Sequence, residues 1–322
     1  MFDDVKISII MSAYNAEKFI DQSIKSILSQ TFEKFIFIAV NNGSNDKTGE
    51  ILQSYAEKDS RLKIINIEGP STYIEGRAKA IECVTTEWFA IMDADDIAEP
   101  KRLERQISFI KSCSKSIGVI GTWASSINEK NTKLAKIHME PTSLEKYEEL
   151  YKKNEAIVPL DPSTIIKKSV FDLAGGYRKE SVPASDLDLW YRISETGYKI
   201  IIIPEELMRY RIHANSSSVY QDMFQRQKTH FVNYNMRKRR AGLKEISWNL
   251  FLTTIWTKPL YKFPRLRNDL GLIFYKRAGF SFAKRNYLNL VIYLITAFFF
   301  KPLHVTKQIY KQIIKPEIKK IK

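Results

Sequence analysis

The chain has 322 residues and a formal net charge of +15, from 51 Lys or Arg and 36 Asp or Glu. This length allows one large domain or two ordinary ones, and no internal repeat is visible in the sequence. The two cysteines, Cys83 and Cys113, fit no metal-binding or redox spacing, which excludes a cysteine-based metal or redox site.

The charge is unevenly distributed along the chain. From Arg226 onward the sequence has 22 Lys or Arg and three acids, whereas residues 1–225 have 29 basic and 33 acidic residues. Two regions with different partners are therefore expected. Charged residues such as Asp3, Asp4 and Lys6 precede the first apolar run, so we expect no secretory signal and a cytoplasmic protein.

Apolar runs alternate with amphipathic segments over the first hundred residues. Strands are expected at 5–11, 35–40, 62–67 and 88–92, and helices at about 19–28, 47–57 and 75–84. This alternation predicts an α/β fold with a mostly parallel sheet covered by helices on both faces. The turns that follow the strands then lie at one edge of the sheet, so Ser12, Asn42 and Asp95 are expected to share a cleft.

Three carboxylates, Asp93, Asp95 and Asp96, follow the fourth expected strand within four positions. Carboxylates this close repel one another unless a cation neutralises them, and a hard divalent metal is the expected ligand. Such a metal commonly completes its shell with phosphate oxygens of the substrate, which points to a phosphorylated substrate. The alternative is an acidic surface turn that caps the helix after Pro100.

An ordered series of motifs resembles family 2 glycosyltransferases of the GT-A, nucleotide-diphospho-sugar type, over roughly residues 5–218. The matching motifs are Ser8–Asn15, Ser26–Phe32, Asn41–Asp46, Arg77, Asp93–Asp96, Gly175–Tyr177, Ser185–Trp190 and Tyr210–His213. The resemblance implies a Rossmann-like GT-A domain at 1–220, with a nucleotide-sugar half at 1–120 and an acceptor half at 121–220. A basic helical extension is expected at 221–322.

On the donor side, the resemblance implies that a nucleotide-sugar, with UDP-sugars the first expectation, contacts a set of residues in the first half. They are Ser12, Ala13, Tyr14, Asn42, Arg77, Asp93 and Ala94. Arg77 is expected on the phosphate side. Asn42 replaces the usual aspartate, and because an amide offers one acceptor and two donors, it could face uracil either way or tolerate another base.

For catalysis, the resemblance implies Mg²⁺ or Mn²⁺ held by Asp95, Asp96 and His213, which would neutralise charge on the leaving diphosphate. Asp186 is the expected general base that takes the acceptor hydroxyl proton in an inverting transfer. The alternative is that Asp186 only caps the following helix, and His213 could equally be structural. Asp161, where many relatives have histidine, is expected to line the acceptor pocket.

The basic tail mixes aromatic with basic residues, which suggests an anionic membrane surface contacted by 226–322. Its apolar run at 288–300 is too short to span a bilayer and is expected either to lie in the membrane plane or to pack as a core helix. Confinement at the inner face of the cell membrane would favour a lipid-linked acceptor.

The sequence as a whole predicts an inverting glycosyltransferase that builds lipopolysaccharide, capsule or another surface polysaccharide by transfer to a saccharide or lipid-linked acceptor. Two alternatives come from other classes. A catalytically lapsed relative could act as a binding or scaffolding module, because Asn42 and Ser185 replace acids. A nucleic-acid-binding protein could use the basic tail, but no nucleic-acid motif is recognisable and nucleic acid is not the expected partner.

Overall fold

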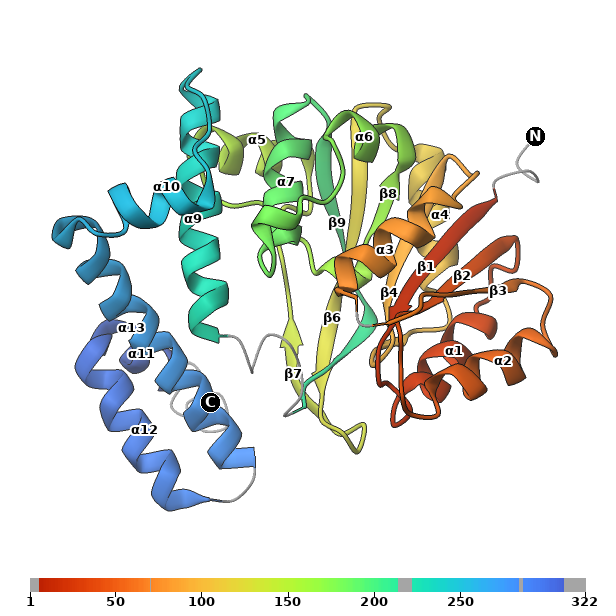
Figure 1. Ribbon diagram of the computed structural model, residues 1–322, viewed down its shortest axis with the longest axis horizontal. Helices are drawn as coiled ribbons and strands as arrows, with labels where there is room; N and C mark the ends of the chain where they lie inside the picture. Colours follow the sequence, from red (N-terminus) through yellow and green to blue (C-terminus); the bar gives the residue numbers. More distant parts are fainter. Residues whose placement is uncertain (1–5, 70, 214–221, 284–285, 310–322) are drawn as a thin grey trace, which may run out of the picture. The chain divides into compact units, whose positions relative to one another are not determined.

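The computed structural model describes residues 6–69, 71–213, 222–283 and 286–309, and the chain divides into two compact units, 1–219 and 220–322. The last part of the basic tail, 310–322, lies outside the described residues. The first unit is built on one nine-stranded sheet (Figure 1). Its strands are β1 (Ile7–Ala13), β2 (Phe35–Asn41), β3 (Leu62–Asn66), β4 (Trp88–Asp93), β5 (Ile97–Ala98), β6 (Ile117–Ile127), β7 (Lys133–Ile137), β8 (Ile165–Lys167) and β9 (Lys199–Arg211).

In the described residues of this unit, seven α-helices and two 3₁₀ turns connect and cover these strands. The α-helices are α1 (Ile20–Leu28), α2 (Thr48–Ala56), α3 (Tyr73–Glu82), α4 (Arg102–Ser112), α5 (Leu144–Lys152), α6 (Lys168–Leu173) and α7 (Ser185–Glu195), and the 3₁₀ turns are η1 (Asp161–Ser163) and η2 (Lys179–Ser181). The expected α/β fold class is confirmed, and every strand and helix expected in the first hundred residues is present.

The strand order is β3-β2-β1-β4-β8-β6-β9-β5, with β7 paired to β6. The first four strands are parallel, and the chain moves from β1 outward to β3 and then back across β1 to β4. Because such crossovers are right-handed, α1 and α2 cover one face of these strands and α3 covers the other. Figure 1 shows α3 in this position, packed against β1 and β2.

The second half of the sheet is mixed rather than parallel. β8 is antiparallel to β4 and β6, β9 is parallel to β6, and β5 is antiparallel to β9. β5 has two residues and β8 has three, which is too short for a hydrophobic period to reveal either strand in the sequence. Three of the four parallel pairings, β1–β2, β1–β4 and β2–β3, lie in the half that the sequence pattern describes, and the fourth joins β6 and β9.

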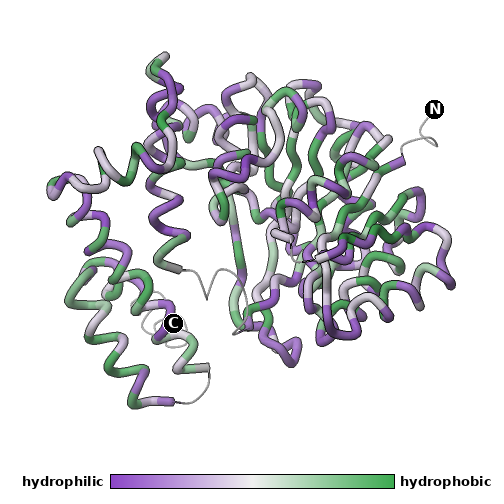
Figure 2. Tube along the Cα trace, in the orientation of Figure 1, coloured by the Kyte–Doolittle hydropathy of each residue, from purple (hydrophilic) through white to green (hydrophobic). Residues whose placement is uncertain are grey.

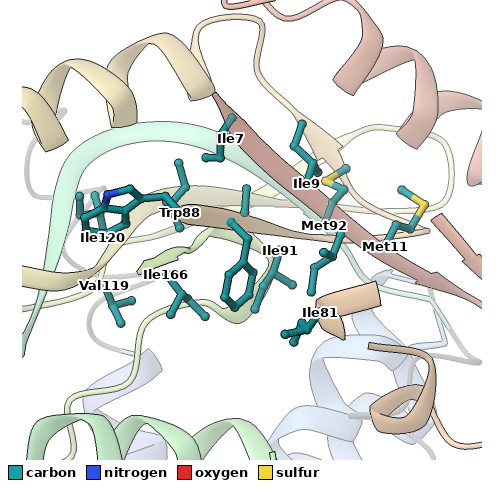
Figure 3. Close-up of a cluster of buried hydrophobic side chains, with 14 of the residues drawn as sticks. Ile7, Ile9, Met11, Ile81, Trp88, Ile91, Met92, Val119, Ile120 and Ile166 are labelled. Carbon is teal, nitrogen blue, oxygen red and sulfur yellow. The ribbon is translucent and has the colours of Figure 1, made fainter. Parts of the chain in front are cut away.

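The core of the first unit lies along β1 and β4, the two central parallel strands. Figure 3 shows Ile7, Ile9 and Met11 of β1 and Ile91 and Met92 of β4 in this hydrophobic cluster, and each is completely buried. Full burial of such a side chain stabilises the fold by about 1.5–3 kcal/mol. The rigid strands hold the loops that follow them in register at one edge of the sheet.

The described residues of the second unit form helices and their connections. The helices are α9 (Asp222–Arg240), α10 (Trp248–Leu250), the π-helical turn η3 (Phe251–Ile255), α11 (Pro259–Ala283), α12 (Tyr287–Phe300) and α13 (Pro302–Ile309). Its core contains an aromatic cluster in which Phe251 contacts Phe231, Trp248, Trp256 and Tyr261. Among the described residues, no helix is both long and apolar enough to cross a membrane.

Candidate functional site

The carboxyl ends of three neighbouring parallel strands bring the expected donor-side residues together. In the sheet register, Ser12 of β1 is opposite Asp93 of β4, and Ala13 is opposite Asn41, so Asn42 follows directly at the end of β2. The backbone N–H of Asn42 donates to the carbonyl of Ala13 at 2.8 Å. These residues share one edge of the sheet, as the strand order requires.

Gly76 of α3 packs against this edge of the sheet, beside the side chains of Ser12 and Asn42. A Cβ at Gly76 would lie 2.9 Å from Asn42 Oδ1 and well inside contact distance of Ser12 Oγ. The first turn of α3 is stabilised by a capping box, in which Thr72 and Glu75 satisfy each other's backbone N–H groups. The glycine is therefore required by packing at this position, since no other residue leaves room for both polar side chains.

Asn42 is buried, and its amide has a defined orientation. Its Nδ2 donates to the carbonyls of Ser71 at 2.9 Å and Thr72 at 3.1 Å, and its Oδ1 accepts from the Ser71 hydroxyl. Two adjacent carbonyls require the NH₂ group on their side, so the orientation follows from the hydrogen bonds. Ala13 next to it is buried, while Tyr14 is exposed at the start of the following turn.

The acidic loop forms a compact cluster. One carboxylate oxygen from each of Asp93, Asp95 and Asp96 lies within 4.8 Å of the other two. Asp96 is completely buried, and its Oδ1 accepts from the backbone N–H of Arg211 at 2.7 Å, while its Oδ2 has no hydrogen-bond partner. The carbonyl of Ala94, between them, accepts from the Ser23 hydroxyl at 2.8 Å, which fixes the loop on α1.

The electrostatics of this cluster favour a bound cation. Burial raises the pKa of Asp96 well above its usual range, and the charges of Asp95 and Asp93 act in the same direction. Burial also raises the pKa of Asp93, against the opposing charge of Arg77. A buried carboxylate with an unsatisfied oxygen, beside two partly exposed carboxylates, fits a hard divalent metal, because oxygen ligands of this kind are those that Mg²⁺ and Mn²⁺ prefer.

A buried arginine at the end of β9 and a histidine two residues after it lie beside the cluster. His213 Nε2 lies 2.9 Å from Asp95 Oδ2. Arg211 donates from Nε to the carbonyl of Asp95 at 2.6 Å and from Nη2 to Gln22 Oε1 at 3.0 Å. Arg211 therefore fixes the backbone of the acidic loop, while His213 is adjacent to the carboxylate that the sequence assigned to the metal.

Arg77 is buried and bridges two carboxylates. Its Nη2 donates to Asp93 Oδ1 at 2.6 Å, and its Nη1 donates to Asp161 Oδ2 and to the Tyr177 hydroxyl at 3.3 Å. Burial opposes its charge, but Asp161, Tyr177 and Asp93 together raise the pKa of Arg77 well above its usual range. The guanidinium that the sequence placed beside a phosphate thus connects the acidic loop to η1.

Asp186 lies in the first turn of α7 and is partly exposed. Removal of water by the surrounding protein raises the pKa of Asp186, while its backbone contacts and the charge of Arg77 oppose this shift. The neighbouring Ser185 is completely buried, and its Oγ is 2.7 Å from the hydroxyl of Tyr73. Burial raises the pKa of Tyr73 to about 12, so this phenol stays protonated at neutral pH.

Sequence reasoning missed part of this network. Tyr73 and the bridging role of Asp161 were not expected, since Asp161 was interpreted as a pocket wall. The one signal in the sequence was an acid at a position where many relatives have histidine. Burial raises the pKa of Asp161 to about 6, against the charge of Arg77 and with the charges of Asp186 and Asp93.

Comparison with known proteins gives a consistent result. The sequence profile of the family described as Glycosyl transferase family 2 matches residues 8–173. The O-antigen biosynthesis glycosyltransferase WbnJ of Escherichia coli is 30% identical over 223 residues, which cover 66% of this chain and 81% of WbnJ.

Two solved structures share the fold at low sequence identity. S. aureus TarS 1–349 in complex with UDP-GlcNAc aligns with a TM-score of 0.56 at 18% identity and covers 91% of both chains. The mannosyltransferase PcManGT of Pyrobaculum calidifontis, in complex with GDP-Man and Mn²⁺, aligns with a TM-score of 0.54 at 15% identity and covers 90% of this chain and 85% of its own. These likenesses establish the GT-A fold.

Proposed function

Because the chain belongs to glycosyl transferase family 2, we propose that it transfers a sugar, with inversion, from a nucleotide-diphospho-sugar to a saccharide or lipid-linked acceptor. The observation that carries this proposal is the cluster of Asp93, Asp95 and Asp96 on the same buried charge network as Asp186. An acidic cluster suits a metal-bound diphosphate, and a separate carboxylate with a raised pKa suits proton abstraction.

Asp95, Asp96 and His213 would hold Mg²⁺ or Mn²⁺. The fit rests on the unsatisfied Oδ2 of Asp96 and on the proximity of the three carboxylates. When bound, the metal supplies positive charge that stabilises the diphosphate leaving group. Arg211 keeps the loop backbone in place, so the ligands are held in position before the donor binds.

The donor base would be read by Asn42. Its NH₂ group is committed to the carbonyls of Ser71 and Thr72, which leaves Oδ1 as the atom available to a ligand once the Ser71 hydroxyl rotates away. An acceptor oxygen pairs with the N3–H of uracil or thymine and the N1–H of guanine, whereas the unprotonated N3 of cytosine is itself an acceptor. Oδ1 therefore admits uracil, thymine or guanine, and of these we propose uracil, in a UDP-sugar, as the resemblance implies; cytosine, which could donate to Oδ1 only from its N4 amino group, is not the expected base.

Asp186 would act as the general base. Its raised pKa brings its basicity closer to that needed at neutral pH, and its partial exposure allows an acceptor hydroxyl to approach. Arg77 would act on the donor indirectly, since its hydrogen bonds go to Asp93 and Asp161. Asp93 is then oriented toward the ribose or the metal shell.

We propose that the acceptor belongs to a surface polysaccharide or lipopolysaccharide precursor. This is supported by the relative named for O-antigen biosynthesis. Synthesis on a lipid-linked acceptor would take place at the cytoplasmic face of the cell membrane, with 226–322 as the membrane-associating part. The excess of basic residues in that part is the property that favours an anionic surface.

The test is hydrolysis of UDP-, dTDP-, GDP- and CMP-sugars by the purified full chain, with Mg²⁺, with Mn²⁺ and with chelator. We expect metal-dependent turnover of a UDP-sugar that is lost in Asp95→Ala, while Asp172→Ala, which removes an exposed acid in α6, keeps it. Asp186→Asn is expected to lose transfer to a saccharide acceptor but to retain metal-dependent nucleotide binding.

The opposite outcome is equally clear. If no donor is turned over and no nucleotide binds in a metal-dependent manner, the proposed transfer is wrong and the lapsed-enzyme alternative stands. Turnover of a CMP-sugar alone would contradict the reading of Asn42.

A further inference from the structure

One face of α12 is entirely apolar and exposed. Within the described residues it presents Leu288, Ile292, Ile295 and Phe299, at the spacing of one helical stripe, and Val291 and Phe298 widen this stripe. These side chains are between 48% and 75% exposed, and α12 contains no charged residue. We refer to these six residues as the α12 stripe.

The other face of α12 is already used for packing on α11. Phe274 of α11 contacts Tyr293 and Phe300, and Gly271 lies directly against Lys301 at the end of α12. Arg267 donates to the carbonyl of Phe300 at 3.1 Å and satisfies the carboxyl end of the helix. These contacts hold α12 against α11, while the α12 stripe points away from α11 and stays exposed. Figure 2 shows the hydrophobic character of α12 along its length.

The charge of the surrounding helices is almost wholly positive. Residues 259–309 contain one acid, Asp269, and nine basic residues: Lys262, Arg265, Arg267, Lys276, Arg277, Lys284, Arg285, Lys301 and Lys307. Asp269 is buried; its Oδ2 lies 2.7 Å from His230 Nε2, and its Oδ1 lies 3.8 Å from Arg226 Nη1. In the described part of this segment, no exposed acid therefore offsets exposed cations such as Arg267, Arg277 and Lys307.

We propose that the α12 stripe inserts into the surface of an anionic lipid bilayer, with α12 lying in the membrane plane. Fourteen residues give a helix about 21 Å long, which is too short to span the apolar core of a membrane. A helix with one wholly apolar face and basic neighbours binds at the interface, where its apolar side chains reach the acyl chains and its cations meet anionic headgroups.

This inference extends the proposed function, because a lipid-linked acceptor would lie on the same surface, but lipid binding itself does not depend on catalysis. A second copy of the chain would also cover an apolar stripe. The lone buried acid and the excess of cations favour the bilayer, since two such cationic surfaces would repel each other.

The experiment is co-sedimentation of the full chain with vesicles of phosphatidylcholine, with and without about 30% phosphatidylglycerol. We expect binding to the anionic vesicles that weakens with salt, and about tenfold weaker binding by Ile295→Asp. Leu243→Asp is the matched control, because Leu243 is 58% exposed in the same unit but lies outside the stripe, against 66% for Ile295. This control should bind like the unsubstituted chain.

A second readout reports insertion directly. In Ile295→Trp, brominated acyl chains should quench the fluorescence of the new tryptophan more strongly than that of the native tryptophans alone. Equal binding by Ile295→Asp and the unsubstituted chain would overturn the proposal. Loss of a concentration-dependent dimer in Ile295→Asp, with vesicle binding unchanged, would also overturn it and would assign the stripe to a second copy.

Donor hydrolysis measured without vesicles separates this inference from the proposed function. Ile295→Asp should hydrolyse the donor as the unsubstituted chain does. If no preparation hydrolyses a donor while vesicle binding follows the expected pattern, the proposed function fails and the membrane surface stands.

Discussion

Replacement of Asp161 by asparagine tests the buried charge network most directly. Asp161 is 9% exposed, contacts Arg77 and lies in η1, and its pKa is raised to about 6 by burial despite the arginine. The ionised carboxylate is therefore less stable in the folded protein than in water. Asparagine has nearly the same shape and carries no charge, so Asp161→Asn removes this penalty.

The magnitude follows from the displacement of the pKa from 3.8 to about 6. Each pKa unit corresponds to about 1.4 kcal/mol, so ionisation of Asp161 costs the fold about 3 kcal/mol. Below pH 3.8 the group is protonated in both the folded and unfolded states. Between pH 3.8 and about 6, Asp161 has lost its proton in the unfolded state but keeps it in the folded state. The free energy of unfolding of the unsubstituted protein therefore falls as the pH rises through this window, whereas Asp161→Asn has no such loss.

The assay is urea-induced unfolding of the full chain in metal-free buffer at several values between pH 4 and pH 7.5. The free energy of unfolding of Asp161→Asn, relative to the unsubstituted chain, should rise by about 3 kcal/mol over this range. Removal of the charge also relieves Asp186 and Asp93, which acts in the same direction.

Asp188→Asn is the control with the opposite sign. Asp188 is also buried, but contacts with Arg178 at 2.8 Å and Arg192 at 3.0 Å lower its pKa against the effect of burial. Asp188→Asn should lower the free energy of unfolding by about 3–5 kcal/mol, and this loss should stay constant above pH 5. A difference between Asp161→Asn and the unsubstituted chain that stays constant with pH, or that falls as pH rises, would refute the reasoning.

Three further outcomes are expected. Asp95→Ala should reduce metal-dependent donor turnover by about 100- to 1000-fold, measured as kcat, because it removes a carboxylate from the proposed metal site; turnover that persists would exclude this site. His213→Gln should weaken Mn²⁺-dependent activation by about 10- to 100-fold, seen in a Mn²⁺ titration, because His213 lies 2.9 Å from Asp95; an unchanged titration would make His213 structural. Gly76→Ala should destabilise the fold by about 1–3 kcal/mol in urea, because its Cβ would press on Ser12 and Asn42, and unaltered stability would contradict the close packing of α3.

Local sequence pattern was enough for the first half of the fold. The apolar run around Ile7–Met11 predicted β1, which begins and ends two residues later than expected. Phe35–Val40 predicted β2 to within one residue. Continuous apolar runs of this length must be buried on both faces, and the alternation with amphipathic helices then requires parallel strands whose following loops meet at one edge. The acidic loop was located from that rule alone.

The second half was less accessible for a physical reason. β8 has three residues and pairs antiparallel with β4, because η1 brings the chain back along the sheet before α6 begins. Strands this short are stabilised by their neighbours rather than by their own composition. The mixed pairing of β8, β6, β9 and β5 therefore depends on contacts that no local window contains.

The same distinction between local sequence and long-range contacts applies to the candidate site. The sequence by itself determined which residue types stand at the strand ends, and with them the acidic cluster, the turn at Asn42 and the carboxylate at Asp186. Only the tertiary structure decided which of them interact. Arg77 and Asp161 are 84 positions apart in the chain, and their pairing exists because α3 and η1 meet beside β4. Residue type and short-range spacing determine what a side chain can do, but the burial and charge that set its pKa and its partners come from segments distant in sequence, which only the folded chain brings together.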